Sequence, residues 1–186
     1  MTIGFAFCGS FCTYAQVFPV LEELAQKYQV IPIFSHSAYT IDSRFGKAED
    51  HIRRAEDICG TGVLHTVAEV EPIGPKKMLD VLIIAPCTGN TLAKLAHSIA
   101  DGPVTMAAKS HLRNGRPVIL AVSTNDALAG AGENIGKLLA RKHYYFVPFG
   151  QDDPEKKPTS MVADFKKIPP TLEAALEGRQ IQPILL

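Results

Sequence analysis

The sequence has no excess of either charge and no long hydrophobic run. Its 186 residues include 19 Lys and Arg against 19 Asp and Glu, so the formal net charge is zero. Nucleic-acid binders usually carry a clear basic excess, and electrostatic membrane contact also needs one. No apolar stretch approaches the ~20 residues of a membrane span. These absences predict a protein that binds neither nucleic acid nor membrane, and the missing charge repulsion favours a homo-oligomer.

Cysteine is scarce, and no targeting segment is recognisable. The four cysteines are Cys8, Cys12, Cys59 and Cys87, and they form neither a CxxC pair nor a metal-ligand spacing. We therefore expect no metal site and reduced thiols. The chain opens directly on an apolar run without a basic leader, which argues against a signal peptide. Together these features predict a cytoplasmic protein.

Short apolar runs alternate with longer stretches of helical period, which is typical of α/β domains. The apolar runs predict strands, and the periodic stretches, several with Gly or Pro at their ends, predict helices. The expected strands are Thr2–Phe7, Val30–Phe34, Val63–Val67, Met78–Ala85, Pro117–Val122 and Tyr144–Pro148. The expected helices are Tyr14–Tyr28, Phe45–Ile58, Thr88–Ile99, Pro103–Leu112, Asp126–Ala140 and Thr171–Glu177.

This alternation predicts a single doubly wound domain with a parallel sheet, a Rossmann-like fold. The core is expected over residues 2–148, followed over 149–186 by a polar loop and a C-terminal helical segment. Sheets of this kind bind ligands outside the carboxyl ends of their strands. The residues that bind a ligand should therefore follow the strands directly.

The loops after the first two predicted strands carry small hydroxyl residues. In the first, Gly9 lets backbone N–H groups approach an anion, and Ser10 and Thr13 offer hydroxyls. In the second, Ser35 and Ser37 could hold a phosphate or a ribose hydroxyl. Ordinary turns and helix caps explain the same residues. The GxGxxG fingerprint of a standard NAD site is absent.

The loops after the fourth and fifth predicted strands carry amides as well. Pro86, Thr88, Asn90 and Thr91 follow the most apolar strand, and Ser123 and Asn125 follow the next one. An Asn amide offers both a donor and an acceptor to a planar heterocycle, and the hydroxyls can bind phosphate or cap the following helix. Cys87 fits a packed thiol better than a redox centre.

These loops together resemble the flavoprotein superfamily of FMN-binding cysteine decarboxylases and flavin prenyltransferases. Its Pro-Ala-Ser-Ala-Asn-Thr motif is matched by Pro86-Cys87-Thr88-Gly89-Asn90-Thr91, whereas only Asn125 survives of its Pro-x-Met-Asn motif. The resemblance implies FMN bound by the residues of the four loops and assembly into an oligomer. The implied cofactor ligands are Gly9, Ser10, Thr13, Ser35, Ser37, Pro86, Thr88, Asn90, Thr91, Ser123 and Asn125.

A second resemblance runs over the whole chain. Stretches such as Arg44–Glu49, Gly74–Lys77 and Phe146–Pro154 are similar to the B-subunit family of dipicolinate synthases. It implies an oxidoreductase component that needs a partner, the A subunit of the synthase, which is expected to carry NAD(P). It also implies oxidation of a dihydro- or hydroxytetrahydro-dipicolinate to dipicolinate in the mother cell of a spore-forming bacterium.

One departure from the superfamily bears on the reaction. Pro72 stands where the decarboxylases carry their catalytic histidine, and Pro has no proton to exchange, so the usual decarboxylation is disfavoured. A dicarboxylate substrate needs cationic partners, for which Arg44, Lys156 and Lys157 are candidates, although the sequence alone favours a solvated charged loop for all three. A flavin-dependent decarboxylase or prenyltransferase and a non-catalytic scaffold remain as alternatives.

Overall fold

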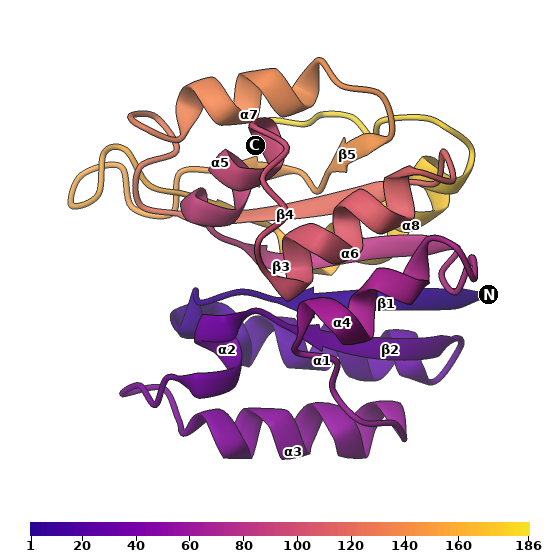
Figure 1. Cartoon of the computed structure of the whole chain (residues 1–186). Helices are drawn as coiled ribbons and strands as arrows, with labels where there is room; N and C mark the ends of the chain where they lie inside the picture. The colour runs from indigo at the N-terminus through magenta and orange to yellow at the C-terminus, as the bar shows by residue number, and fades with distance from the viewer.

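The most apolar segments of the sequence form the centre of a seven-stranded sheet (Figure 1). The computed structural model describes all of residues 1–186. Five strands run parallel in the order β2-β1-β3-β4-β5, and every residue of β3 is buried. Such continuous apolar runs are expected where helices cover both faces of a sheet. The parallel strands are β1 (Thr2–Phe7), β2 (Gln29–Phe34), β3 (Val81–Cys87), β4 (Val118–Thr124) and β5 (Tyr144–Phe146).

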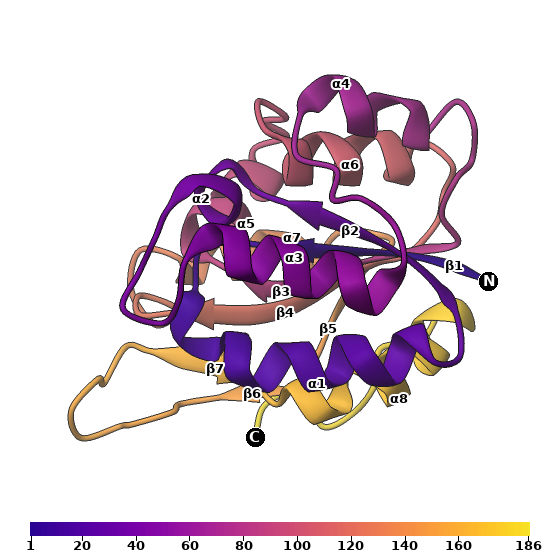
Figure 2. The same ribbon diagram turned by 90° about the horizontal axis from the view of Figure 1, so that it is seen from below.

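Helices cover both faces of this sheet. Figure 2 shows α1 and α8 on one face and α4 and α6 on the other, with α3 lying beside the edge strand β2. α5 and α7 pack together, and α5 also contacts α6. No helix is both long and apolar enough to cross a membrane. The helices are α1 (Tyr14–Ala25), α2 (His36–Thr40), α3 (Ala48–Cys59), α4 (Val67–Val70), α5 (Gly89–Ala96), α6 (Pro103–Leu112), α7 (Gly132–Leu139) and α8 (Ile168–Leu176), with single 3₁₀ turns at Phe11–Thr13, Glu71–Ile73 and Phe165–Lys167.

The doubly wound parallel sheet expected from the sequence is confirmed, with two short antiparallel strands added to it. β6 (Phe149–Gly150) and β7 (Met161–Ala163) pair with each other in antiparallel fashion. β7 also pairs antiparallel with Ser123 and Thr124 at the end of β4. β5 stops opposite Leu120, so the last residues of β4 are left unpaired on that side and accept β7. Segments of two or three residues are too short to show an alternating pattern, so no sequence signal marks them.

Two other expected elements are wrong in part. Val63–Val67 forms no strand: only Leu64 makes a bridge to Ile33, and α4 begins at Val67 after a capping box between Thr66 and Glu69. The helix expected from Asp126 begins at Gly132, because turns occupy the residues before it. The Asp126 carboxylate accepts a hydrogen bond from the Thr124 hydroxyl at 2.6 Å, so this residue belongs to a strand-end turn.

A buried histidine joins the end of α6 to the start of β4. The side chain of His111 is fully buried, and its Nε2 atom lies 3.0 Å from the carbonyl oxygen of Pro117. Burial disfavours the charged imidazolium and lowers the pKa of His111 to about 4. The folded protein therefore holds this side chain neutral at a pH where an unfolded chain binds a proton.

We expect this histidine to make the protein less stable in acid. Between pH 6.5 and about 4, the unfolded chain binds one more proton at His111, so the free energy of unfolding falls as the pH is lowered. The loss approaches about 1.4 kcal/mol per pH unit at its steepest. Urea unfolding across this pH range should give a flatter profile for His111→Gln than for wild type. His97→Gln, at an exposed position, should keep the wild-type slope, and equal slopes in all three proteins would contradict the prediction.

Candidate functional site

The strand order creates a crevice between the loops after β1 and β3. These two strands are neighbours in the sheet, but the chain leaves β1 for α1 on one face and β3 for α5 on the other. Where consecutive connections diverge in this way, the carboxyl ends of the strands leave room for a ligand. The first and third hydroxyl-bearing loops therefore flank the crevice, and those after β2 and β4 lie beside them.

The first loop is held in place by its own side chains. The Ser10 hydroxyl lies 2.7 Å from the Ser123 hydroxyl at the end of β4. Thr13 is buried and donates to the carbonyl of Ser10 at 2.8 Å, while the Tyr14 hydroxyl donates to the carbonyl of Cys8 at 2.9 Å. Thr13 thus shapes the loop from beneath, and Ser10 joins it to the fourth loop.

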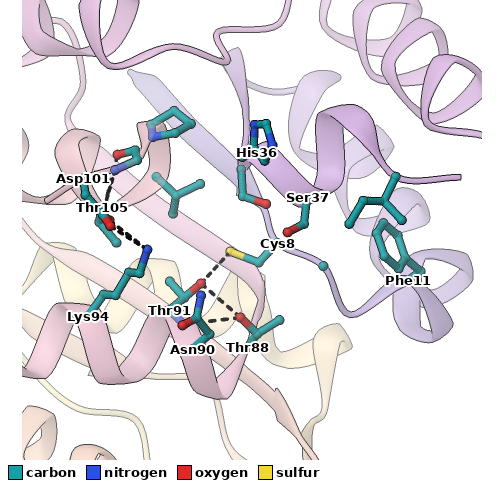
Figure 3. Close-up of a pocket in the computed structure, with 16 residues that line it drawn as sticks. Cys8, Phe11, His36, Ser37, Thr88, Asn90, Thr91, Lys94, Asp101 and Thr105 are labelled. Carbon is teal, nitrogen blue, oxygen red and sulfur yellow. Dashed lines mark hydrogen bonds and ion pairs between the residues drawn. The ribbon is translucent and has the colours of Figure 1, made fainter. Parts of the chain in front are cut away.

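The loop after β3 caps the helix that follows it (Figure 3). The Thr88 hydroxyl accepts from the backbone N–H of Thr91 at 3.3 Å, and the Thr91 hydroxyl donates to the sulfur of Cys8 at 3.3 Å. The first N–H groups of a helix have no partner within it, so those of Gly89 and Asn90 stay available to a ligand. Asn90 is exposed, with its amide free of partners within the chain. The same loop therefore caps α5 and borders the crevice.

Two adjoining cavities open among the four loops, and Gly9, Phe11 and Thr88 line both of them. The first cavity has a volume of about 480 Å³, and the second about 330 Å³. Both volumes lie in or near the range of small-molecule sites. Of the predicted site residues, the first cavity is lined by Gly9, Ser35, Ser37, Thr88, Asn90 and Thr91, and the second by Gly9, Ser10, Arg44, Thr88, Ser123 and Asn125.

The remaining predicted residues lie elsewhere. Pro86 is buried inside β3, and Thr13 lies under the first loop, so neither lines a cavity. Lys156 and Lys157 belong to the exposed connection between β6 and β7, and the Lys157 ammonium is paired with Asp152 at 3.0 Å. The structure thus brings Arg44 to the crevice and leaves the two lysines outside both cavities.

Sequence reasoning missed the far wall of the first cavity. It consists of Lys94 on α5 and of residues around the start of α6. The Lys94 ammonium lies 2.8 and 2.9 Å from the two carboxylate oxygens of Asp101, and this hydrogen bond lowers the pKa of Asp101. Gly102-Pro103 is a recognisable helix start and could have indicated this wall, whereas no local signal marks Lys94. The N-termini of α5 and α6 both border the cavity, and their partial positive charge favours an anion.

Two buried cysteines near the crevice, Cys8 and Cys87, are not activated nucleophiles. Burial raises the pKa of Cys8 to about 11 and raises that of Cys87 well above its ordinary value. Cys87 is fully buried in β3, as expected for a packed thiol. Pro72 lies in a 3₁₀ turn outside both cavities, and the nearby His65 stacks on Tyr39 with ring centroids 3.8 Å apart. The exposed His36 borders the first cavity.

Comparison with known proteins agrees with this architecture. A family model described as Flavoprotein matches residues 1–149. The chain belongs to the Flavoprotein family. It is 46% identical over 185 residues to a Bacillus subtilis protein named as the B subunit of dipicolinate synthase, covering 99% of this chain and 92% of that protein. Family membership thus rests on a match over most of the chain.

Solved structures support the same fold. A crystal structure of the B subunit of dipicolinate synthase from Bacillus halodurans is 45% identical, with a TM-score of 0.91 over 100% of this chain and 95% of that one. DmrB of Burkholderia xenovorans, solved in complex with FMN, gives a TM-score of 0.69 at 18% identity, covering 95% of both chains. At that identity the second likeness concerns the fold alone.

The close approach of the third and fourth loops at Gly89 can be tested directly. A Cβ atom at this position would lie 2.6 Å from Oγ1 of Thr124 and 2.8 Å from Oδ1 of Asp126, closer than packed atoms allow. We expect Gly89→Ala to push the loops apart and lower the free energy of unfolding by about 1–3 kcal/mol. Gly136→Ala is the matched control, since nothing lies within 4 Å of its Cβ position in α7. There the change should raise stability by roughly 0.5–1 kcal/mol. Thermal and urea unfolding measure the stability of both variants. Equal changes in the free energy of unfolding would contradict the close approach at Gly89.

Proposed function

We propose that this chain is the B subunit of a dipicolinate synthase. Together with its A partner it oxidises a dihydro- or hydroxytetrahydro-dipicolinate to pyridine-2,6-dicarboxylate. The observation that carries the proposal is the 46% identity over 99% of the chain to a protein of that name. The reaction belongs in the cytoplasm of the mother cell of a spore-forming bacterium. There the B subunit works as a homo-oligomer together with an A subunit that carries NAD(P).

The two cavities fit FMN, which supports a flavin in the proposed enzyme. A Cβ at Gly9 would lie 3.3 Å from Cβ of Ser37, a tight contact, so glycine at this position keeps the gap between the first two loops open. Hydroxyls of Ser10, Ser35 and Ser37 and the N-terminus of α5 suit a phosphate, and the amides of Asn90 and Asn125 suit a heterocycle. When bound, a flavin supplies an acceptor or donor of electrons.

Within this proposal, Arg44 binds a carboxylate of the substrate. Its side chain is exposed at the second cavity, forms no ion pair within the chain, and has its guanidinium carbon 4.8 Å from the centroid of the Phe45 ring. A guanidinium binds carboxylates through two parallel hydrogen bonds, which also fixes their orientation. The charge of Arg44 is therefore free for a dicarboxylate, whereas that of Lys157 is already paired.

The reaction itself tests the function. Both purified components of the synthase would be mixed with the precursor and with NAD(P), and formation of pyridine-2,6-dicarboxylate followed. We expect activity only when both components are present. Full activity of the isolated A component would contradict a catalytic role for this chain. It would favour the alternative that the chain is a non-catalytic scaffold. Release of carbon dioxide by this chain would instead favour a flavin-dependent decarboxylase.

Flavin binding has a prediction of its own. Asn90→Ala removes an exposed amide that lines the first cavity, and we expect FMN affinity to fall roughly two- to tenfold, the worth of one hydrogen bond. Titration of the FMN-depleted chain by flavin fluorescence measures this. Asn134→Ala, on α7 outside both cavities, is the matched control and should bind like wild type. If the wild-type chain neither contains nor takes up FMN, the proposal that it binds a flavin is wrong, whatever the outcome of the synthase assay.

Arg44 is tested by steady-state kinetics of the two-component enzyme. Loss of a charge-assisted hydrogen bond costs about 1.5–3 kcal/mol, so Arg44→Gln should raise KM for the precursor roughly ten- to a hundredfold. Arg44→Lys should recover only part of this, because an ammonium lacks the paired donors of a guanidinium. Arg53→Gln, on the exposed surface of α3, serves as control. An unchanged KM in Arg44→Gln would show that the substrate carboxylate does not bind at Arg44.

A further inference from the structure

A third cavity lies away from the four loops, between α5, α6 and the segment that leads into β5. Its volume is about 420 Å³. One wall comes from the end of α5 and the residues after it, the second from α6, and the third from residues 141–144. Thr105 of α6 lines both this cavity and the first one, so the two adjoin. The proposed function makes no use of this cavity.

The charge of the cavity is of one sign. Lys109, Arg141, Lys142 and His143 line it, and no Asp or Glu does. The chain as a whole has zero net charge, so this is a local concentration of positive groups. Like charges gathered around a concave surface raise the local concentration of anions. The cavity is therefore complementary to a negatively charged molecule.

The four basic side chains differ in what holds them. Arg141 donates to the carbonyls of Leu95 and Ala96 at 3.0 and 2.6 Å, so its guanidinium caps the end of α5 and is fixed there. The ammonium groups of Lys109 and Lys142 form no ion pair or hydrogen bond within the chain, and both residues are exposed. By contrast, the lysine of α7, Lys137, lies 2.7 Å from Glu133.

Helix-dipole compensation explains only part of this arrangement. Lys109 lies in the last turn of α6, where a cation is favoured by the helix dipole alone. Lys142 belongs to no helix. It brings a second positive charge to the cavity from another segment of the chain, and the dipole of α6 does not account for that.

The rest of the lining combines apolar side chains with a phenol and with the hydroxyls of Ser98 and Thr105. Leu95 is buried, Leu112 is half-buried and the side chain of Ile99 is 48% exposed. Tyr144 adds an aromatic ring, and burial raises the pKa of its hydroxyl to about 12, which keeps the O–H as a donor at neutral pH. An apolar surface bordered by cations suits a ring that carries carboxylates better than it suits a bare inorganic anion.

We propose that this cavity binds a planar aromatic dicarboxylate, with its ring on Leu95, Ile99 and Leu112 and its carboxylates toward Lys109 and Lys142. The class of ligand follows from the charge and the apolar surface of the cavity. Its identity as pyridine-2,6-dicarboxylate rests on the proposed function. Because Thr105 borders the first cavity too, the product would be held next to the site where we place the flavin.

The test is calorimetric titration of the intact chain with pyridine-2,6-dicarboxylate and with benzene-1,3-dicarboxylate, which has the same shape without the ring nitrogen. We expect both to bind, and the double variant Lys109→Gln/Lys142→Gln to lower their affinity at least tenfold, as expected for lost charged hydrogen bonds. The matched control is Lys76→Gln/Lys166→Gln, two exposed lysines outside this cavity, which should bind like wild type. Urea unfolding and FMN titration should be unchanged in both variants.

Three results would overturn the inference: no binding by wild type, equal affinity in the double variant, or loss of binding in Arg44→Gln instead. The last would place the dicarboxylate at the second cavity. The synthase assay keeps the two proposals apart. Turnover by the two-component enzyme without binding in the titration overturns only this site. Binding of both dicarboxylates that depends on Lys109 and Lys142, without any turnover, supports this site and overturns the proposed function.

Discussion

The structure depends on burying both faces of a parallel sheet. β3 has no residue in contact with solvent, and in β1 all residues from Ile3 to Phe7 are buried. Strands of this kind can carry no polar side chain along their length, so polar groups gather where the strands end. Because the five parallel strands point the same way, their ends share one edge of the sheet. The hydroxyls and amides of four loops meet there as a consequence of how the core is packed.

The same hydroxyls serve the fold and the candidate site, which limits what each can do for a ligand. Ser35 accepts from the N–H of Ala38 as the cap of α2, and Thr88 accepts from Thr91 as the cap of α5. A hydroxyl oxygen has two acceptor positions and one donor, so the cap leaves the O–H of Ser35 for a ligand. The O–H of Thr88 is used within the chain, because its oxygen lies 3.0 Å from that of Thr91, whose own proton goes to the sulfur of Cys8. The sequence alone leaves capping and binding as alternatives. At Ser35 the geometry makes them compatible, because the cap uses the acceptor and leaves the donor.

Elements with a strong local sequence signal were predicted correctly, and elements that depend on contacts between distant residues were missed. The buried run around Val81 and the glycine at position 60 each carry a strong local signal. The structure has strand β3 at the first, and at the second helix α3 ends on a glycine in the left-handed backbone conformation. The start of α7 was misplaced because the competing turn depends on Thr159, whose hydroxyl donates to the carbonyl of Asn125 at 2.7 Å. β7 was missed because a three-residue strand exists only through its pairing with β4. The ion pair of Lys94 and Asp101 likewise has no local signature.

Pro72 and the pKa values of the thiols bear on what chemistry the site needs to supply. Pro72 stands where the resemblance to the superfamily implies the histidine of the decarboxylases, and burial keeps Cys8 and Cys87 protonated. The oxidation that we propose, of a dihydropyridine dicarboxylate, makes smaller demands on side chains. It removes two electrons and two protons and gains the aromaticity of the product, so positioning of the ring matters more than a strong base. Neutral donors around the crevice suit a planar cofactor, and the unpaired guanidinium of Arg44 suits a carboxylate that must be oriented. Pro72 in place of the implied histidine is therefore consistent with the proposed change of reaction on a retained fold.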